Sequence, residues 1–292
     1  MDGNETKLIL SIVIASYNYG RFIEAAIQSV ASQMSDEIEL IVVDGGSTDN
    51  SVDIIKKYAR ERESVISYWV SEPDKGQSDA FNKGFAKARG KYLTWLNADD
   101  IMPDGCLKKV ITAFKKHPES EWFTGNVFRF LEDGRVSEIG WGPHFFPAFL
   151  QRKNSPSSIA VFGPSTFFSK KIYEQVGQID VNLVNTMDYD LWIKFVMAGI
   201  HQRRINCFCW AFRMHEASKS AEYGEHSVSK QVRDMISREV EVIRARSGYH
   251  PCDFWRKVMI VWRLLDGSMF RLMWYRLTLK RIDQRVAAWR SK

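Results

Sequence analysis

The first hundred residues alternate between short apolar runs and segments whose apolar positions have helical spacing. The apolar runs, rich in β-branched residues, predict buried strands over 8–14, 39–43, 65–70 and 91–96. Apolar positions three and four residues apart predict helices over 22–34, up to about 59, and over 78–88. Gly90 stands where a glycine commonly closes a helix. This alternation predicts an α/β fold with a doubly wound, mostly parallel sheet and flanking helices.

Polar residues follow three of the predicted strands. They are Ser16, Tyr17 and Asn18 after the first, Asp44 after the second, and Asn97, Ala98 and Asp99 after the fourth. Ligands of parallel α/β sheets bind beyond the carboxyl ends of the strands. We therefore expect these three clusters to converge on one edge of the sheet.

The chemistry of these residues suits a phosphorylated ligand, although each has a structural alternative. Asp99 can hold Mg²⁺ or Mn²⁺, which takes one or two protein carboxylates and neutralises a diphosphate. Alternatively, Asn97 and Asp100 cap the turn that follows. Asp44 can accept hydrogen bonds from a nucleobase or a ribose, or cap the next helix. Tyr17 can stack on a base or pack in the core.

The rest of the chain is less regular. Residues 104–222 mix strands, aromatic side chains and loops, with a polar, proline-containing loop at 154–158. Residues 227–246 are charged and helix-forming, which predicts a helix. Residues 253–292 alternate apolar and aromatic side chains with Lys and Arg.

The composition is that of a globular protein, with 292 residues of which 45% are hydrophobic and 26% charged. The sequence holds neither an uninterrupted apolar run of about 18 residues nor the basic-then-apolar layout of a signal peptide. Its four cysteines form no C-x-x-C pair, and Cys207 and Cys209 lack the matching second pair of a zinc site. We expect free thiols and a cytoplasmic location.

The net charge of +6 is unevenly distributed. Residues 253–292 hold ten Lys and Arg against three Asp and Glu, while the remaining residues hold 31 basic and 32 acidic groups. One interpretation is a helix in a membrane interface that faces anionic lipid, which would place the protein peripherally on the inner face of the plasma membrane. The other is a helical hairpin packed on the body or on a second subunit. No nucleic-acid-binding motif accompanies the charge.

Seven sequence blocks carry a resemblance to a known family. They lie at 11–18 (SIVIASYN), 42–49 (VVDGGSTD), 72–84 (EPDKGQSDAFNKG), 90–100 (GKYLTWLNADD), 163–168 (GPSTFF), 187–192 (MDYDLW) and 213–220 (RMHEASKS). In this order they resemble the family 2 glycosyltransferases of bacterial surface-polysaccharide assembly, which have the GT-A fold. The resemblance implies a GT-A domain over 1–222, with a nucleotide-sugar-binding half at 7–103 and an acceptor half at 104–222. Residues 223–292 would form a helical, basic and aromatic extension.

The resemblance also implies donor-binding and metal-binding residues. Those expected to contact the nucleotide sugar are Ala15, Ser16, Tyr17, Asn18, Asp44, Lys75, Gly76, Asp79, Asn97, Ala98 and Asp99. Asp99 would bind the metal, Mn²⁺ or Mg²⁺, and His215 stands where some members place a further ligand. Asn97 replaces the commoner Asp, so its amide would face the ribose rather than coordinate the cation.

Asp188 stands at the family's catalytic-base position, and Met187 replaces the Glu that usually precedes it. A sugar hydroxyl needs its proton removed as it attacks, and one carboxylate opposite the leaving diphosphate gives inversion. If this segment opens a helix, Asp188 and Asp190 alternatively cap it.

The resemblance implies an inverting hexosyl- or N-acetylhexosaminyl-transferase. The donor would be a nucleotide-diphosphate sugar, for which we expect UDP, and the acceptor a hydroxyl of a glycan or a lipid-linked glycan. A non-catalytic member that binds nucleotide sugar or glycan is an alternative, because Asn97 and Met187 depart from the family pattern. A nucleotidyltransferase is disfavoured, because no Gly-rich basic loop follows the first strand.

Overall fold

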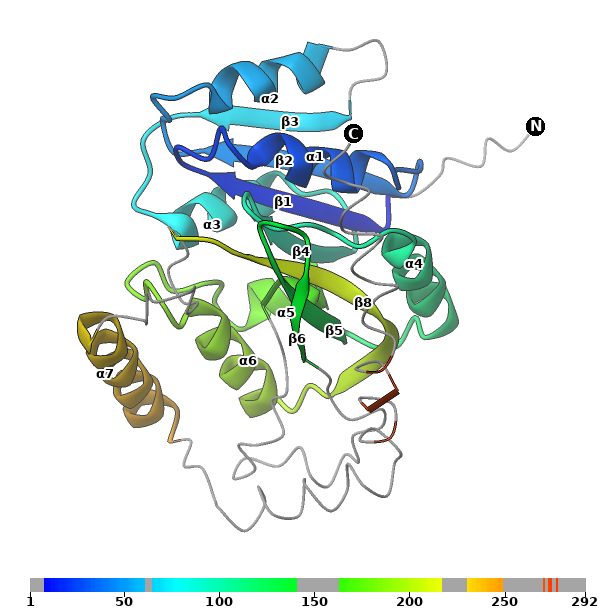
Figure 1. Ribbon diagram of the computed structural model, residues 1–292. Coiled ribbons are helices and arrows are strands. Elements are labelled where there is room, and N and C mark those ends of the chain that lie inside the picture. The colour runs from blue at the N-terminus through cyan, green and yellow to red at the C-terminus, as the bar shows by residue number, and fades with distance from the viewer. Residues whose placement is uncertain are drawn as a thin grey trace.

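A computed structural model describes residues 8–60, 65–140, 163–216 and 230–248, together with 270, 273, 274 and 277. Its centre is an eight-stranded sheet in the order β3-β2-β1-β4-β7-β5-β6, with β8 paired to β5 (Figure 1). The strands are β1 (Leu10–Ser16), β2 (Ile38–Asp44), β3 (Ile66–Ser71), β4 (Tyr92–Asn97), β5 (Trp122–Leu131), β6 (Val136–Gly140), β7 (Thr166–Ser169) and β8 (Gln202–Met214). The helices are α1 (Ile23–Ala31), α2 (Ser51–Arg60), α3 (Gln77–Lys87), α4 (Cys106–Lys116), α5 (Lys170–Gln175), α6 (Met187–Met197) and α7 (Lys230–Ser247), with a 3₁₀ turn, η2, at Gly163–Ser165.

The first four strands form the parallel half of the sheet. Strand β1 pairs in parallel with β2 and β4, and β2 pairs in parallel with β3. The prediction of a doubly wound α/β arrangement is therefore confirmed, and the predicted elements coincide with the observed ones to within a few residues at their ends. Apolar runs mark these strands because parallel strands are buried on both faces.

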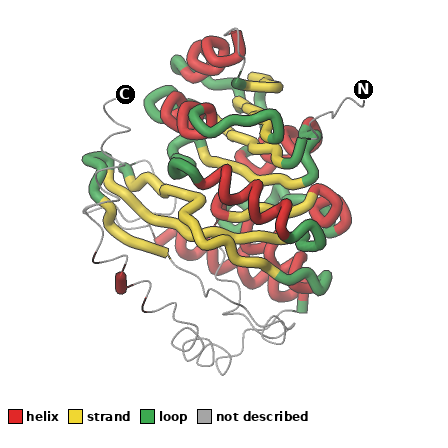
Figure 2. Tube along the Cα trace, turned by 90° about the vertical axis from the view of Figure 1, so that its right-hand side faces the viewer, coloured by secondary structure: helices red, strands yellow, loops and turns green. Residues whose placement is uncertain are grey.

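The strands carry apolar side chains on both faces, and each face has its own core. On one face, Ile12 and Leu40 pack with helices α1, α2 and α4. On the other face, Val13 and Ile41 pack with α3, α5 and α6. Consecutive strand residues point to opposite faces, so one continuous apolar run supplies both cores. The helices lie in two layers around the sheet in Figure 2.

The second half of the sheet changes strand direction. Strand β7 pairs antiparallel with both β4 and β5, so it joins the parallel half to the rest. Strand β5 pairs antiparallel with β6 and, along its other edge, in parallel with β8. The long strand β8 thereby returns toward β4, where Ile101 bridges to Ala211.

The prediction for Gly90 is wrong. Helix α3 ends at Lys87 and is followed by Ala88, whose backbone is extended, and Gly90 does not adopt the positive φ of a helix-closing glycine. A Cβ on Gly90 would lie 2.8 Å from the backbone carbonyl carbon of Leu10. Glycine is needed here because the chain passes close to the start of β1.

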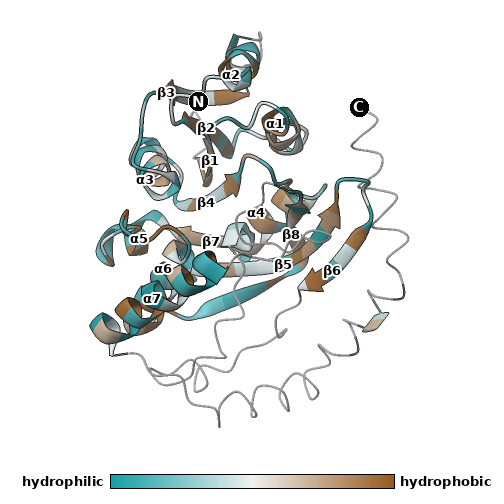
Figure 3. Cartoon of the chain, turned by 60° about the vertical axis from the view of Figure 1, so that its left-hand side comes forward, coloured by the Kyte–Doolittle hydropathy of each residue, from teal (hydrophilic) through white to brown (hydrophobic). Residues whose placement is uncertain are grey.

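The structure also tests the expectations for the helix near 227–246 and for the cysteines. Helix α7 confirms the helix predicted over 227–246, and it runs beside α6 (Figures 1 and 3). Cys106, Cys207 and Cys209 are free thiols, as expected. The loop at 154–158, Cys252 and most of 253–292 lie outside the described residues. Within the described part of the chain, no helix is long and apolar enough to cross a membrane. The boundaries at 103 and 222 remain predictions.

Candidate functional site

The predicted polar clusters converge at the carboxyl ends of the parallel strands. Ser16 is paired in register with Asp44, and Ala15 with Asn97. Ser71, at the end of β3, is in register with Asp44 on its other side. The hydroxyl of Ser16 is buried and has no hydrogen-bond partner among the described residues. Such an orphaned group at a strand end suits a site that completes its bonds with a ligand.

Asp44 organises the loop that follows β2. Its Oδ2 accepts hydrogen bonds from the N–H groups of Gly46 (3.1 Å) and Ser47 (2.8 Å) and from the hydroxyl of Ser71 (2.7 Å). Its Oδ1 accepts from the hydroxyl of Ser47. The carboxylate is fully buried and holds the turn directly after β2. It does not cap α2, because the N–H of Ser51 at the start of that helix donates to Asp49.

The loop after β1 is tied to the loop after β2. The side-chain oxygen of Asn18 accepts a hydrogen bond from the N–H of Thr48 (2.8 Å), and the N–H of Asn18 donates to the hydroxyl of Ser47 (2.7 Å). Asn18 holds a left-handed backbone conformation, with φ of 57°. Tyr17 is 58% exposed, so its ring is open to solvent rather than part of the core.

A third loop, over 72–79, comes to the same edge. The N–H of Lys75 donates to the carboxylate of Asp79 (3.1 Å), which forms the first turn of α3. Gly76 precedes α3 with φ of 107°, a conformation that favours glycine. The amide of Gln77 donates to the side-chain oxygen of Asn97 (2.9 Å). The N-terminus of α3 is thereby connected to the end of β4.

Asp99 and His215 meet at the end of β4. Oδ2 of Asp99 lies 3.1 Å from Nε2 of His215, and the two side chains are 12% and 2% exposed. The ring of Phe22 packs against His215 in a tilted arrangement, with 4.5 Å between the ring centres. Tyr19 faces the same carboxylate: burial, and then the charges of Asp99 and Asp100, raise the pKa of its phenol above the ordinary value.

Asp100 is a structural residue rather than a second ligand. It is fully buried, and its oxygens accept hydrogen bonds from the N–H of Arg213 (2.9 Å) and the amide of Asn97 (2.8 Å). Burial, followed by the nearby charge of Asp99, raises the pKa of Asp100 well above its ordinary value. Nε of Arg213 donates to the carbonyl of Asp99 (2.8 Å), so β8 fixes the backbone around Asp99.

Asp99 and His215 fit a divalent cation as a partial ligand set. Adjacent ligands of an octahedral ion with bonds of ~2.1 Å lie ~3.0 Å apart, close to the 3.1 Å between Oδ2 and Nε2. No group of three or more His, Cys, Asp or Glu within the described residues could hold a metal alone. A cation at this pair would complete its coordination with ligand oxygens and water, as Mg²⁺ and Mn²⁺ do at phosphate sites.

Asp188 lies in the first turn of α6, so the segment does open a helix. Its Oδ1 accepts a hydrogen bond from the N–H of Tyr189 (2.7 Å), and burial raises its pKa above the ordinary value. No basic side chain among the described residues pairs with it. A Cβ built on Gly163, in η2, would lie 3.7 Å from Oδ2 of Asp188 and 3.5 Å from the ring of Trp210. The 163–168 and 187–192 blocks therefore meet around this carboxylate.

Asp190, two residues on, has a different role. Its carboxylate is buried and pairs with Lys194 (3.0 Å) and with Arg246 of α7. These cations make Asp190 part of the contact between α6 and α7. Among the described residues, the carboxylate of Asp188 accepts main-chain hydrogen bonds and has no basic partner.

The sequence analysis did not single out Tyr19, Gln77, Trp210 or Arg213. Arg213 and Gln77 lie inside recognised blocks, but their partners are determined by how distant strand ends meet. A cavity of about 690 Å³ between α1 and the loop at 101–105 was also unforeseen, and none of its described lining residues is a predicted site residue.

Comparison with known proteins identifies the family. The sequence profile described as glycosyl transferase family 2 matches residues 11–177, more than half of the chain. The chain belongs to glycosyl transferase family 2. The match includes the strand ends with Asp44 and Asp99 and stops before Asp188 and His215.

Among curated relatives, the chain is similar to a PGL/p-HBAD biosynthesis glycosyltransferase of Mycobacterium bovis, with 28% identity over 189 residues, 64% of this chain and 69% of the relative. It is 38% identical over 106 residues to an uncharacterized glycosyltransferase of Nostoc, covering 36% of this chain. An uncharacterized glycosyltransferase of Rickettsia typhi is 26% identical over 207 residues, 67% of this chain. The matches span 33% of the Nostoc relative and 61% of the Rickettsia typhi relative.

Solved structures show the same fold. S. aureus TarS 1-349 in complex with UDP-GlcNAc superposes with a TM-score of 0.57 at 16% identity, over 80% of this chain and 66% of that one. The mannosyltransferase PcManGT from Pyrobaculum calidifontis, in complex with GDP-Man and Mn²⁺, gives 0.57 at 16% identity over 96% of this chain and 73% of that one. The fold is that of the GT-A glycosyltransferases, as the resemblance implied.

Proposed function

We propose that this protein transfers a sugar from a nucleotide-diphosphate sugar to an acceptor hydroxyl, with inversion at the transferred carbon. The proposal rests on one observation: a pair of side chains that suits a metal ion and a carboxylate that suits a general base lie around one edge of the sheet. The Asp99–His215 pair suits a metal-bound diphosphate, and Asp188, free of basic partners among the described residues, suits a general base. Membership of family 2 supports the same assignment.

The donor would lie across the ends of β1, β2 and β4. The exposed ring of Tyr17 offers a surface on which a base can stack, and stacking of this kind contributes about 1–3 kcal/mol. Ala15, Ser16 and Asn18 would line the base pocket, and Asp44 shapes its floor through the loop it holds. Lys75, Gly76 and Asp79 would border the nucleotide from the α3 side, with Asn97 and Ala98 near the ribose. We propose a UDP-sugar, in line with the UDP-GlcNAc complex of TarS.

Asp99 and His215 would hold the divalent cation. The cation supplies charge neutralisation and orientation of the diphosphate oxygens. Carboxylate oxygen suits both Mg²⁺ and Mn²⁺, and the imidazole nitrogen favours Mn²⁺ of the two. Tyr19 and Arg213 fix the surroundings of Asp99, so that its carboxylate keeps its direction. PcManGT, with the same fold, was crystallised with GDP-Man and Mn²⁺.

Asp188 would act on the acceptor. As the acceptor oxygen forms its bond to the anomeric carbon, its proton passes to the carboxylate of Asp188. The bond from that carbon to the diphosphate breaks, and the nucleoside diphosphate leaves with the electron pair. The raised pKa suits this role, because a base works best when its pKa is closer to the working pH. One carboxylate and one displacement give inversion.

The proposal for the acceptor rests on exposed apolar side chains near the C-terminus and on the positive charge of the segment that contains them. Phe270, Met273, Trp274 and Leu277 have the spacing of one helix face, and each is between 60% and 77% exposed. They belong to the segment 253–292, with ten basic and three acidic residues. An apolar face with flanking cations suits an anionic membrane surface. We therefore propose a glycan or lipid-linked glycan acceptor in cell-envelope polysaccharide assembly, with the protein bound peripherally at the inner face of the membrane.

The test is the release of nucleoside diphosphate from a panel of UDP-, GDP- and dTDP-sugars in the presence of Mn²⁺ and of a bacterial membrane extract that supplies glycan and lipid-linked glycan hydroxyls. We expect release from one or more UDP-sugars, and loss of release in the Asp188→Asn variant. A protein that binds these donors but releases nothing from any of them is a binding module, and the proposal of catalysis would then be wrong.

A further inference from the structure

Helix α7 lies outside the segment that the family profile matches, yet it contacts the helix that carries Asp188. Figures 1 and 3 show α7 alongside α6. Ile243, on the face of α7 toward the body, is fully buried and belongs to the same core cluster as Leu191 and Phe195 of α6. The remaining positions of α7 are exposed or half-buried. The polar side chains of α7 add to this apolar contact with α6 and with the loop before it.

Glu239 of α7 binds the chain immediately before α6. Its carboxylate accepts hydrogen bonds from three successive N–H groups, those of Val184 (3.0 Å), Asn185 (3.0 Å) and Thr186 (2.9 Å). It also accepts one from the hydroxyl of Thr186 (2.8 Å). Burial alone would raise the pKa of Glu239, but these hydrogen bonds outweigh it and hold the pKa below the ordinary value. The group is therefore an anion at neutral pH.

This arrangement holds the chain that leads into α6 rather than the N–H groups of its first turn. Thr186 is the residue that precedes the helix, and its side chain makes no capping bond to the helix. The hydroxyl instead donates to Glu239. Helix N-termini carry a partial positive charge and attract carboxylates, so the charge of Glu239 beside the residues that precede the helix is favourable. The start of α6 is thus fixed from α7.

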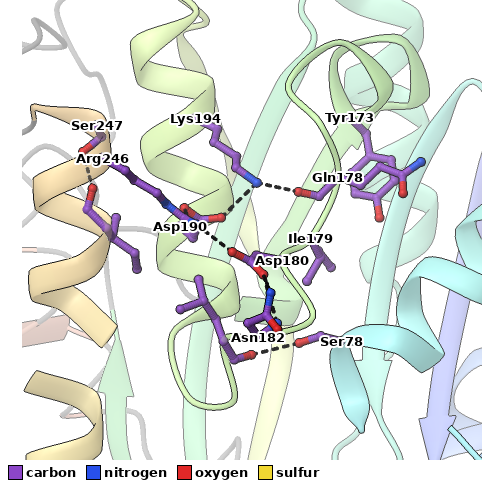
Figure 4. Close-up of polar contacts among 12 residues, drawn as sticks. Ser78, Tyr173, Gln178, Ile179, Asp180, Asn182, Asp190, Lys194, Arg246 and Ser247 are labelled. Atoms are coloured by element: carbon purple, nitrogen blue, oxygen red, sulfur yellow. Dashed lines mark hydrogen bonds and ion pairs between the residues drawn. The ribbon is translucent and has the colours of Figure 1, made fainter. Parts of the chain in front are cut away.

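Two arginines of α7 make further contacts with α6 and with the loop before it. Arg246 bridges Asp180 (2.6 Å), on the loop before α6, and Asp190, in the first turn of α6 (Figure 4). Asp190 also pairs with Lys194, one turn further along α6. Arg244 lies near enough to Tyr189, the residue after Asp188, for its charge to act on the pKa of that phenol. We call Glu239, Arg244 and Arg246 the α7 clamp.

We propose that the α7 clamp positions Asp188 for catalysis, and that Glu239 is its principal positioning residue. This inference rests on the proposed role of Asp188 as general base. Glu239 accepts a hydrogen bond from Thr186, which lies two residues before Asp188. Arg246 forms an ion pair with Asp190, which lies two residues after it. The groups that face Asp188 across the site, Gly163 and Trp210, lie on η2 and β8. The distance across the site therefore depends on where α6 begins.

Small displacements of a catalytic group matter. A misplacement of about 1 Å can reduce a rate by about 100-fold. The donor groups Asp44, Asn97 and Asp99 are fixed by β-strand ends and by Arg213, and the α7 clamp touches none of them. Loosening the clamp should therefore impair the base while leaving donor binding intact.

The experiment compares Glu239→Gln and Glu239→Ala with a matched control, Glu241→Gln, an exposed acid two residues along the same helix. Binding of UDP with Mn²⁺ gives the dissociation constant and the concentration of competent sites. Turnover is measured with the sugar donor and the acceptor preparation that the wild type uses. The rate is divided by the concentration of competent sites, so that unfolded protein does not lower the measured kcat.

We expect kcat per site to fall about 10-fold to 100-fold in Glu239→Ala, with the dissociation constant of UDP within about twofold of wild type. Glu239→Gln should retain part of the activity because its amide oxygen still accepts a hydrogen bond, and Glu241→Gln should match wild type. If Glu239→Ala does not fold, Arg246→Lys tests the same clamp and should also lower kcat at unchanged UDP affinity.

Equal turnover per site in wild type and in the folded clamp variants would overturn the inference and leave the proposed function standing. So would a loss of UDP affinity that matches the loss of turnover. A wild type that binds UDP but releases nothing from any donor would overturn the proposed function, and this inference with it.

Discussion

Oδ2 of Asp99 lies 3.1 Å from Nε2 of His215, although 116 residues separate the two in the chain. The contact exists because β8 pairs in parallel with β5 and returns to the end of β4, where Arg213 bonds to Asp99 and Asp100. The imidazole of His215, which follows β8, thereby lies beside the carboxylate of Asp99, which follows β4.

The first prediction concerns metal affinity. His215→Gln should raise the Mn²⁺ concentration needed for half-maximal UDP binding by about tenfold or more, because it removes one of two protein ligands. Asp99→Asn should raise it further, since an amide is a weaker ligand than a carboxylate. Isothermal titration at several Mn²⁺ concentrations measures both. His201→Gln, at an exposed position, is the control and should match wild type. An unchanged Mn²⁺ requirement in His215→Gln would remove this residue from the metal site.

The parallel half of the fold could be predicted from the sequence because its signals are local. Apolar runs mark each buried strand, and the convergence of Asp44 and Asn97 at one edge follows from parallel pairing. Local patterns contain no information about which side chains meet across a hundred residues. Tyr19 facing Asp99, Arg213 bonding to its carbonyl and Glu239 holding Thr186 all depend on tertiary pairing.

Gly90 and the pair Asp188 and Asp190 show the same limit. Gly90 looked like a helix-closing glycine, but it serves a close approach to Leu10 that only the folded sheet creates. Asp188 and Asp190 are equivalent acids in the sequence, but in the structure Asp190 pairs with Lys194 and Arg246 whereas no basic side chain among the described residues pairs with Asp188.

The second prediction concerns the general base. Asp188→Asn should lower kcat by about 10²-fold to 10⁴-fold, the usual contribution of a positioned base. The dissociation constant of UDP with Mn²⁺ should stay within about twofold, because the hydrogen bond of Asp188 is to Tyr189 of α6 and not to the residues at the strand ends that would hold the donor. Steady-state kinetics and titration measure the two quantities. Asp36→Asn, at an exposed site, should change neither. Full activity in Asp188→Asn would show that another group takes the proton.

The third prediction concerns stability and pH. Burial raises the pKa of Asp188, so the folded state binds this proton more tightly than the unfolded state does. The stabilisation by the neutral acid is complete below the unfolded pKa, about 3.9, and is lost as the pH rises through the folded pKa. Asp188→Asn should therefore melt above wild type at pH 7, by about a few degrees, with the difference closing toward about pH 4. Equal melting temperatures at pH 7 would contradict the raised pKa.

The fourth prediction concerns the exposed face at 270–277. Phe270→Ser combined with Leu277→Ser should weaken flotation with vesicles rich in phosphatidylserine, because it removes apolar area from the membrane-facing side. Wild-type binding should also weaken with added salt, since screening reduces the attraction of its basic residues to anionic lipid. Tyr68→Ser, which removes an exposed aromatic ring on β3, is the control. Unchanged flotation in the double variant would favour packing of this segment on protein.

The most direct test of the central claim needs no acceptor. Melting temperature is measured with UDP, GDP, CDP and dTDP, each with and without Mn²⁺, for wild type and Asp99→Asn. A ligand at about 100 times its dissociation constant stabilises by roughly 2.7 kcal/mol, which corresponds to about 5–11 °C at this chain length. We predict a shift of this size for wild type with UDP and Mn²⁺ together, little shift with UDP alone, and little shift in Asp99→Asn. Equal melting temperatures of wild type with every nucleotide, with and without Mn²⁺, would contradict a metal-bridged nucleotide-sugar site at Asp99.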